Sequence, residues 1–335
     1  MSMSKGPDQG LGAVLKVLRG ATDPISGERL AGQLGLSRAA VWKRVHRLKA
    51  MGYIIEGSPR RGYRLLGLPD KLLADEVLQG LKTSVLTGPV HHFETLDSTN
   101  NYAKELAARE APEGTVVIAE TQTLGRGRLG REWDSPPGVG LYVSVVLRPQ
   151  LPPMELPQIT LTAAVAVVRA THRVTHVTPG IKWPNDLIVH GKKLGGILTE
   201  METESDRIRH VVIGLGLNVN NAVFPPELAK TATSLAQVVG GTLSRVELLK
   251  AWLEEFEDLY KRFLNQGFPE ILEEWKRYAV TLGRAVTVRQ GPREISGQAV
   301  DVASDGALLL LTPAGEIVRV TSGEITPEPE GGSGV

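Results

Sequence analysis

A glycine- and arginine-rich segment near residue 125 has the residue types of an anion-binding loop. It reads Thr121-Gln122-Thr123-Leu124-Gly125-Arg126-Gly127-Arg128-Leu129-Gly130-Arg131-Glu132-Trp133. Guanidinium groups make paired hydrogen bonds to phosphate and carboxylate oxygens, and free backbone N–H groups can bind the same anions. Glycines would let the loop close after binding. We interpret it as a lid over a polyphosphate or an acyl phosphate rather than as an ordinary exposed basic loop.

The glycines of this segment also satisfy the G-x-G-x-x-G pattern of dinucleotide-binding domains. In that pattern a helix begins at the glycines, so that its N-terminus meets the pyrophosphate. Here Asp134-Ser135-Pro136-Pro137-Gly138 follows and cannot continue a helix. We therefore reject the dinucleotide interpretation. The spacing is not that of a P-loop either.

A second cluster reads Lys182-Trp183-Pro184-Asn185-Asp186 and lies between a strand-like run and a turn. A positioned lysine can neutralise a carboxylate and a developing phosphoryl charge together, which stabilises the transition state. The alternative is a simple hairpin with Trp183 in the core.

Polar side chains at the ends of two predicted elements are further candidates. Ser98 and Thr99 precede a helix, where either could cap it or, with Asn100, bind a neutral polar ligand. Asn218 follows the strand-like run 211–217, at the kind of strand end where open sheets bind ligands. His172 and His176 have helical spacing but no third ligand, so we predict no metal site from them. The ligands of any metal stay unknown.

The first 66 residues have the pattern of a winged helix-turn-helix. Helical runs near 11–18, 27–34 and 37–50 precede two strand-like pieces at 53–55 and 62–66. From Ser37 to Arg64 there are eight basic residues and one acidic residue, which leaves 30 basic and 36 acidic residues elsewhere. This local charge favours DNA binding over protein contacts alone, because neutralised phosphates supply most nonspecific affinity. The candidate DNA contacts are Ser37, Arg38, Lys43, Arg44, Arg47, Arg60 and Arg61.

Two further segments complete an α+β multidomain chain. Residues 69–281 alternate strand-like runs (115–120, 141–148, 211–217) with helix-like ones (99–109, 156–174, 244–265). This alternation and a hairpin-like stretch at 183–200 predict a mixed sheet. From 282 to 330, short strands between glycine-containing turns predict a small SH3-like barrel. The predicted domains are therefore 1–68, 69–281 and 282–330.

The composition excludes several classes of protein. The 335 residues include no cysteine, which rules out disulfide scaffolds, thiol nucleophiles and cysteine-based metal sites. No run approaches about 18 consecutive apolar residues, and the N-terminus lacks the apolar core of a signal peptide. We expect a cytoplasmic protein with no membrane partner.

Taken in order, these motifs resemble those of the biotin protein ligases. The segment 27–43 also resembles the winged helix-turn-helix of the bifunctional members, which act as biotin operon repressors. The resemblance covers nearly the whole chain and implies a central fold shared with class II aminoacyl-tRNA synthetases. The matching motifs are Asp97-Ser98-Thr99-Asn100, Gly125-Arg126-Gly127-Arg128 with Gly130, Arg131 and Trp133, Lys182-Trp183-Pro184-Asn185-Asp186, and Gly214-x-Gly216-x-Asn218.

The resemblance implies a two-step reaction. Biotin and ATP would form biotinyl-5′-AMP, with Mg²⁺ expected beside ATP. The biotinyl group would then pass to a lysine of a biotin carboxyl carrier domain, in acetyl-CoA carboxylase or a related carboxylase. The implied catalytic residues are Lys182, Arg126 and Arg128; the biotin site is Ser98, Thr99, Asn100, Gln122, Arg126, Gly127, Arg128 and Lys182; the nucleotide site is Arg126, Arg128, Arg131, Trp133, Lys182 and Asn218.

The resemblance also implies operator DNA as a partner and a homodimer favoured by biotinyl-AMP. Two other functions stay open at this point. One is lipoate ligation on the related fold, and the other is a ligand-sensing transcription factor that does not turn its ligand over. The arginine-rich lid and Lys182 argue against the second, because sensing does not require a polyphosphate clamp.

Overall fold

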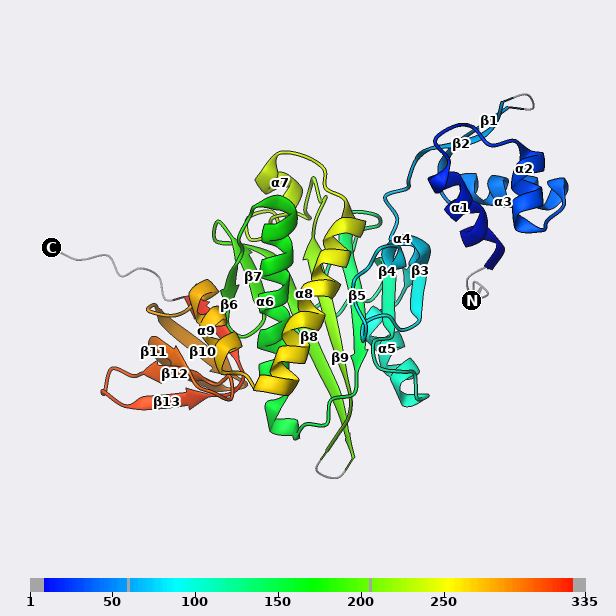
Figure 1. Cartoon of the computed structure of the whole chain (residues 1–335). Coiled ribbons are helices and arrows are strands. Elements are labelled where there is room, and N and C mark those ends of the chain that lie inside the picture. Colours follow the sequence, from blue (N-terminus) through cyan, green and yellow to red (C-terminus); the bar gives the residue numbers. More distant parts are fainter. Residues whose placement is uncertain (1–8, 59–60, 205–206, 328–335) are drawn as a thin grey trace. The chain divides into compact units, whose positions relative to one another are not determined.

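The computed structural model describes residues 9–58, 61–204 and 207–327 (Figure 1). Two compact units divide the chain, residues 1–79 and residues 80–335. Arg60, one of the candidate DNA contacts, lies outside the described residues. Within them, no helix is long and apolar enough to cross a membrane. The three domain boundaries drawn from the sequence stay a prediction.

The first unit is the predicted winged helix-turn-helix. Val41, Val45 and Leu48 lie on one face of the third helix and are buried with Leu30 of the second. Gly35 ends the second helix with a φ of 63°, a conformation that suits glycine and turns the chain. Its elements are α1 (Gln9–Gly20), α2 (Gly27–Leu34), α3 (Arg38–Ala50), the wing strands β1 (Ile54–Ser58) and β2 (Gly62–Gly67), and α4 (Ala74–Leu78).

The second unit is built on a seven-stranded mixed sheet. Its strands are β3 (Val90–Leu96), β4 (Val116–Gln122), β5 (Gly140–Leu147), β6 (Gly180–Lys182), β7 (Asp186–Val189), β8 (Lys192–Glu204) and β9 (Arg207–Asn218). They are ordered β3-β4-β5-β9-β8-β7-β6. Among the described strands, β3 and β4 pair in parallel and the other neighbours pair antiparallel. The mixed sheet predicted from the sequence is confirmed.

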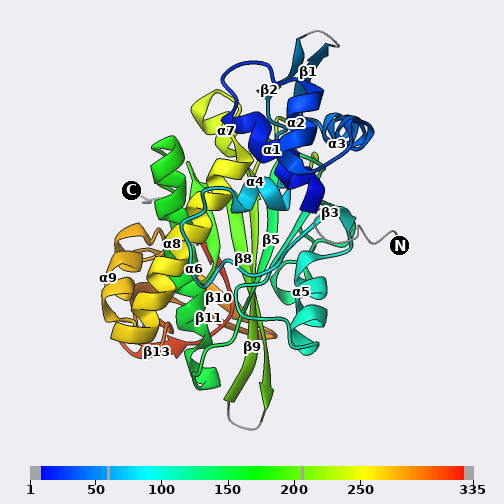
Figure 2. The ribbon, with the colours of Figure 1, turned by 45° about the vertical axis from the view of Figure 1, so that its right-hand side comes forward.

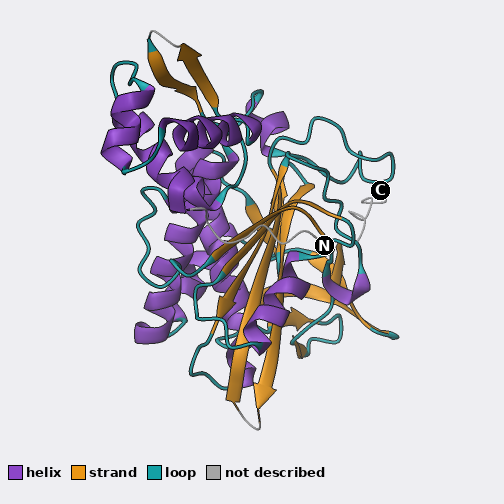
Figure 3. Ribbon diagram, turned by 90° about the vertical axis from the view of Figure 1, so that its right-hand side faces the viewer, coloured by secondary structure: helices purple, strands orange, loops and turns teal. Residues whose placement is uncertain are grey.

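Helices cover the sheet on both sides, as Figure 3 shows. Ala103 and Ala107 of α5 (Thr99–Ala108) pack against Val117, Val146 and Val212 of the sheet. The long helices α6 (Leu156–Thr175) and α8 (Arg245–Gln266) pack against each other and against β8 and β5, respectively. Burial on both faces explains why β5 is apolar along nearly its whole length, with Ser144 as the exception, rather than alternating. The short α7 (Leu235–Val239) follows β9.

A five-stranded antiparallel sheet ends the second unit. Its order is β13-β12-β11-β10-β14, and it lies beside α9 (Pro269–Tyr278) (Figure 2). Lys276 of α9 forms an ion pair with Asp301 at 2.9 Å, and the Trp183 indole donates a hydrogen bond of 3.0 Å to the Gly306 carbonyl. The strands are β10 (Ala285–Gln290), β11 (Arg293–Val302), β12 (Leu308–Leu311), β13 (Ile317–Val320) and β14 (Glu324–Pro327).

The short strands that the sequence predicts at 285–289, 294–302, 307–311 and 317–320 match four of these five, but β14 was missed, as were β3 and α9. The reason for β14 is physical. Its stretch Glu324-Ile325-Thr326-Pro327 holds one large apolar residue and has no periodicity to recognise. It becomes a strand because β10, some 35 residues earlier, offers it an edge for pairing from Val286 to Arg289.

Candidate functional site

A cavity of about 490 Å³ opens in the second unit, a volume typical of small-molecule sites. The residues around it come from the start of α5, the end of β4, the loop after it, the end of β6 and the end of β9. All the site residues that the sequence predicted in this unit line the cavity: Ser98, Thr99, Asn100, Gln122, Arg126, Gly127, Arg128, Arg131, Trp133, Lys182 and Asn218. The fold therefore brings together four segments that are far apart in the sequence, at 98–100, 122–133, 182 and 218.

The predicted lid is a loop between β4 and β5. No α-helix begins at the glycines of this loop, which the structure describes in full. The loop contains a short 3₁₀ turn, Arg128–Gly130. Leu129 and Gly130 have φ values of 57° and 75°, so the chain reverses tightly there. The Gly127 N–H donates to the Arg131 carbonyl at 2.7 Å and closes the turn. This geometry aims the three arginines in different directions.

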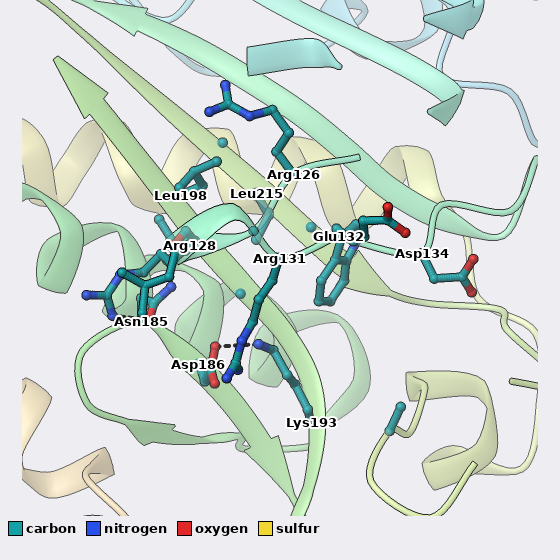
Figure 4. A pocket seen from close by; sticks show the side chains of 18 of the residues that line it. Arg126, Arg128, Arg131, Glu132, Asp134, Asn185, Asp186, Lys193, Leu198 and Leu215 are labelled. Carbon is teal, nitrogen blue, oxygen red and sulfur yellow. Dashed lines mark hydrogen bonds and ion pairs between the residues drawn. The ribbon is translucent and has the colours of Figure 1, made fainter. Parts of the chain in front are cut away.

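Figure 4 shows Arg126 pointing away from Arg128 and Arg131. Arg128 is half-buried and donates to the Asn185 side-chain oxygen at 3.1 Å and to the Gly323 carbonyl at 3.4 Å. Burial lowers the pKa of Arg128, although the charges of Asp186 and Glu324 oppose the shift.

Arg131 is exposed and forms an ion pair with Glu324. Together with the Arg128–Gly323 hydrogen bond, this pair shows that the C-terminal sheet contributes to the cavity. Sequence analysis missed that wall, Gly323 to Ile325, because nothing local to these residues marks them as a binding segment.

The start of α5 forms a buried polar wall. Ser98 occupies the N-cap position, but its side chain makes no capping hydrogen bond. Instead the Gln122 side-chain oxygen accepts from the Thr99 N–H at 2.8 Å. The Ser144 hydroxyl lies 2.8 Å from the Thr99 hydroxyl and 2.6 Å from the Asn100 side-chain oxygen. Of the two alternatives for Ser98, this arrangement favours ligand binding over capping.

Two glycines of β9 make room for this wall and for the Trp133 ring. A Cβ atom on Gly214 would lie 2.0 Å from the Asn100 Oδ1, and one on Gly216 would lie 2.6 Å from the Trp133 Cε2. Neither approach is possible for a residue with a side chain unless its neighbour moves. The Trp133 Nε1 is buried and has no hydrogen-bond partner among the described residues.

Lys193 was missed by sequence analysis. It lines the cavity from β8, with its Nζ 2.7 Å from the Asp186 Oδ1 (Figure 4) and 5.7 Å from the centroid of the Trp133 ring. The only sequence signal was its place after the His190-Gly191 turn, which is typical of any exposed hairpin. The register of β7 with β8 brings it to the cavity.

Lys182 ends β6 and pairs across the hairpin turn with Asp186. It is half-buried, and its ammonium forms no ion pair within the described part of the chain. Trp183 points the other way and is 2% exposed in the core. Trp183 is therefore structural, and Lys182 lines the cavity as a positive charge, while its catalytic role stays a prediction.

A buried ion pair supports the strands on either side of the lid. Arg245 is fully buried at the start of α8, and its Nη1 donates to the Glu120 Oε2 at 2.8 Å and to the Gly140 carbonyl at 3.2 Å. His92 Nε2 lies 3.1 Å from the other Glu120 oxygen. Glu120 is on β4, two residues before Gln122, and Gly140 begins β5. The pair therefore joins the two strands from which the lid loop extends.

In the first unit, four of the basic candidate DNA contacts are exposed: Arg38, Lys43, Arg47 and Arg61. Arg44 is only half-exposed, because it lies over Gly10 of α1 and donates to the Ala40 carbonyl at 3.3 Å. The Ser37 hydroxyl oxygen accepts from the Ala40 N–H at 3.1 Å and caps α3. The sequence does not mark Trp42, which is 52% exposed and packs against the His46 ring, with the ring centroids 4.1 Å apart and the planes tilted by 43°.

Three family models match the chain. Residues 92–218 match the biotin/lipoate A/B protein ligase family, residues 11–64 match an HTH domain, and residues 281–326 match the biotin protein ligase C-terminal domain. Each model falls on a part of the fold already described: the central sheet, the winged helix-turn-helix and the C-terminal sheet.

Relatives match the chain over most of its length and of theirs. The chain is 43% identical over 303 residues to the bifunctional ligase/repressor BirA of Bacillus subtilis, covering 90% of this chain and 93% of the relative. It is 31% identical to the protein of the same name from Escherichia coli, covering 85% and 87%. Among solved structures, a biotin protein ligase from Aquifex aeolicus in complex with biotin and ATP has a TM-score of 0.62 and 32% identity, covering 71% of this chain and 97% of that one.

Replacing Glu120 by alanine should destabilise the second unit by about 3–5 kcal/mol, because the buried Arg245 charge would lose the carboxylate that neutralises it. Urea unfolding of the full chain measures the change. Glu294→Ala is the matched control, since Glu294 pairs with Arg289 on the exposed surface of the C-terminal sheet. The control should change the stability by less than about 1 kcal/mol. Equal losses in the two variants would contradict the structural role of the buried pair.

Proposed function

This chain belongs to the family of bifunctional biotin protein ligases and repressors, and from that premise we propose how its cavity works. It is a ligase that activates biotin with ATP and passes the biotinyl group to a lysine of a biotin carboxyl carrier domain. One observation carries this proposal. A single cavity holds a neutral polar wall, a set of cationic side chains and an indole ring, which are the three chemistries that biotinyl-5′-AMP requires.

The polar wall formed by Thr99, Asn100 and Gln122 would hold the biotin ring system. A ureido group has donors and acceptors, and a buried polar group left without partners is costly. Hydroxyl and amide side chains that already face one another can supply both kinds of partner. Ser98 would complete this end of the site.

Lys182 and Arg128 would act on the charged centre of the substrate. A biotin carboxylate oxygen attacks the α-phosphorus of ATP, a P–O bond forms, and pyrophosphate leaves. Negative charge grows on the non-bridging oxygens, where a fixed ammonium and a desolvated guanidinium stabilise it. The amine of the acceptor lysine then attacks the acyl carbon, and AMP leaves. The chain has no cysteine, so no enzyme thioester takes part.

The nucleotide would occupy the side of the cavity that Trp133 and Asn218 line. The indole face offers a stacking surface for a base, and the Asn218 amide at the end of β9 offers hydrogen bonds. Arg126 and Arg131 would reach the phosphates when the lid closes. Mg²⁺ is expected with ATP, but the described residues include no group of three His, Asp or Glu side chains that could hold a metal. We therefore assign it no residue of this chain.

The first unit would bind operator DNA in the cytoplasm, with α3 in the major groove and the wing along the phosphates. Support comes from the exposed basic side chains on α3 and the wing, which include Arg38, Lys43, Arg47 and Arg61. A homodimer that forms with biotinyl-AMP would present two such units to paired half-sites.

The adenylation role of Lys182 predicts a large effect of Lys182→Ala. Biotin-dependent exchange of pyrophosphate into ATP should fall by about 100- to 1,000-fold, the usual cost of losing one transition-state charge partner. Lys192→Ala removes an exposed lysine from the neighbouring β7–β8 hairpin and should leave exchange unchanged. Near-wild-type exchange in Lys182→Ala would overturn the role, and exchange supported by lipoate in place of biotin would overturn the substrate.

The two glycines of β9 predict a separation of effects. Gly214→Ala should displace Asn100 and raise the KM for biotin by about tenfold or more, whereas Gly216→Ala should displace Trp133 and raise the KM for ATP by a similar factor. Gly241→Ala is the control, because nothing lies within 4 Å of its added Cβ. Exchange kinetics measure both constants. If both substitutions raised the KM for biotin and the KM for ATP by the same factor, the assignment of biotin to the Asn100 side and of the nucleotide to the Trp133 side would be contradicted.

DNA binding by α3 predicts a change in salt dependence. Arg38→Ala should lower the affinity for mixed-sequence duplex DNA and reduce the slope of log K against log salt by about one. Lys16→Ala, an exposed lysine on α1, should leave the slope unchanged. Titrations at several salt concentrations measure it. The same slope in Arg38→Ala and wild type would place the DNA surface elsewhere.

A further inference from the structure

Glu200 lies directly behind the wall of the cavity and takes no part in the assignments above. It is on β8, half-buried, and does not line the cavity. Its Oε2 accepts from the Asn100 Nδ2 at 2.9 Å. Its Oε1 accepts from the Lys104 Nζ at 2.7 Å and from the Arg126 Nη1 at 3.2 Å. One carboxylate thus contacts both the polar wall and the lid.

The carboxylate decides which way the Asn100 amide faces. An ionised carboxylate can only accept hydrogen bonds, so it selects the amide nitrogen of Asn100. That nitrogen also donates to the Leu198 carbonyl at 3.3 Å. The Asn100 oxygen is therefore directed to the Ser144 hydroxyl at 2.6 Å. If the amide were flipped, the Asn100 oxygen would face the Glu200 carboxylate and the Leu198 carbonyl, and none of these oxygens can donate a hydrogen bond.

The same carboxylate holds Arg126 at the rim of the cavity. Arg126 donates to Glu200 and, at 2.8 Å, to the Asn101 side-chain oxygen. These two contacts account for the direction of Arg126 in Figure 4, away from Arg128 and Arg131.

The charge of Glu200 is secured by its surroundings. Burial by itself would raise the pKa of Glu200, but the hydrogen bonds from Lys104 and Asn100 and the charges of Lys104 and Arg126 outweigh it. The pKa therefore lies below its usual range, and the group is ionised at neutral pH. Both of its positioning contacts require this charge state.

We propose that Glu200 is a positioning residue of the ligase site, which fixes the orientation of the Asn100 amide within the polar wall and holds the Arg126 guanidinium at the rim of the cavity while the lid is open. This inference rests on the proposed function for the identity of the substrate. Glu200 acts through Asn100 and Arg126 and does not touch the reacting atoms. Its effect therefore falls on substrate affinity and not on the chemical step.

Glu200→Gln tests the inference, because it removes the charge of the side chain and keeps its shape. A glutamine can offer either an oxygen or an NH₂ group to Asn100, so the amide orientation is no longer enforced. The Kd of biotin from calorimetry, measured without ATP, should rise about tenfold, as for the loss of one charge-assisted hydrogen bond. The kcat of pyrophosphate exchange should stay within about twofold of wild type, since uniform binding is what is lost.

Two further variants separate positioning from packing. Glu200→Asp keeps an acceptor-only charge and should recover most of the biotin affinity. Lys104→Met removes the other cation from the same carboxylate, touches neither Asn100 nor Arg126, and should leave the Kd within about twofold. Thermal unfolding of each variant records its folding.

The outcomes divide cleanly. The inference is supported if Glu200→Gln binds biotin more weakly than wild type, Glu200→Asp recovers most of the biotin affinity, and Lys104→Met leaves the Kd unchanged. A Glu200→Gln variant that binds biotin like wild type overturns the inference. It is also overturned if Glu200→Gln and Glu200→Asp lose kcat to the same extent and thermal stability to the same extent. A wild-type chain that binds biotin but exchanges no pyrophosphate overturns the proposed ligase function instead, and the Kd comparison still decides the role of Glu200. A wild-type chain that binds no biotin overturns both.

Discussion

The cavity exists because β9 carries no side chain at two positions next to it. Asn100 and Trp133 approach Gly214 and Gly216 so closely that a Cβ atom at either position would lie within 2.6 Å of them. β9 lies between β5 and β8 in the sheet, so it cannot shift away without breaking two ladders of hydrogen bonds. The polar wall and the indole face therefore depend on these glycines, and every assigned role depends on where those two surfaces lie.

Rigid and adjustable parts of the site are divided between different interactions. The buried Arg245–Glu120 pair and the covered sheet fix the two ends of the lid. The lid itself is joined to its surroundings by exposed or half-buried contacts of arginines with Glu200, Asn185 and Glu324. Exposed ion pairs are weak in water, so a bound phosphate can replace them at small cost. This contrast suits a loop that must close over a ligand and open again.

Charge is also divided along the chain. The segment from Ser37 to Arg64 holds eight basic residues and one acidic residue, and the remainder has a slight excess of acidic residues. On α3 the structure separates these basic residues by role. Arg38, Lys43 and Arg47 are exposed, whereas Arg44 lies over Gly10 and stabilises the packing of α3 on α1. A count of charges predicts a DNA-facing unit, but only the packing tells which arginine is available to a phosphate.

The sequence by itself determined the helices and strands with strong periodicity and the motif residues that line the cavity, because residue type, spacing and glycine content are local properties. It could not determine Lys193, the wall from Gly323 to Ile325, or Glu200, since each is brought to the site by pairing or packing with residues far away in the chain. For the same reason β14 was missed: its strand conformation comes from the edge of β10 and not from its own four residues. What only the tertiary structure decided is which side chains face one another, because a hydrogen bond or a steric gap is a property of two positions and neither position carries it alone.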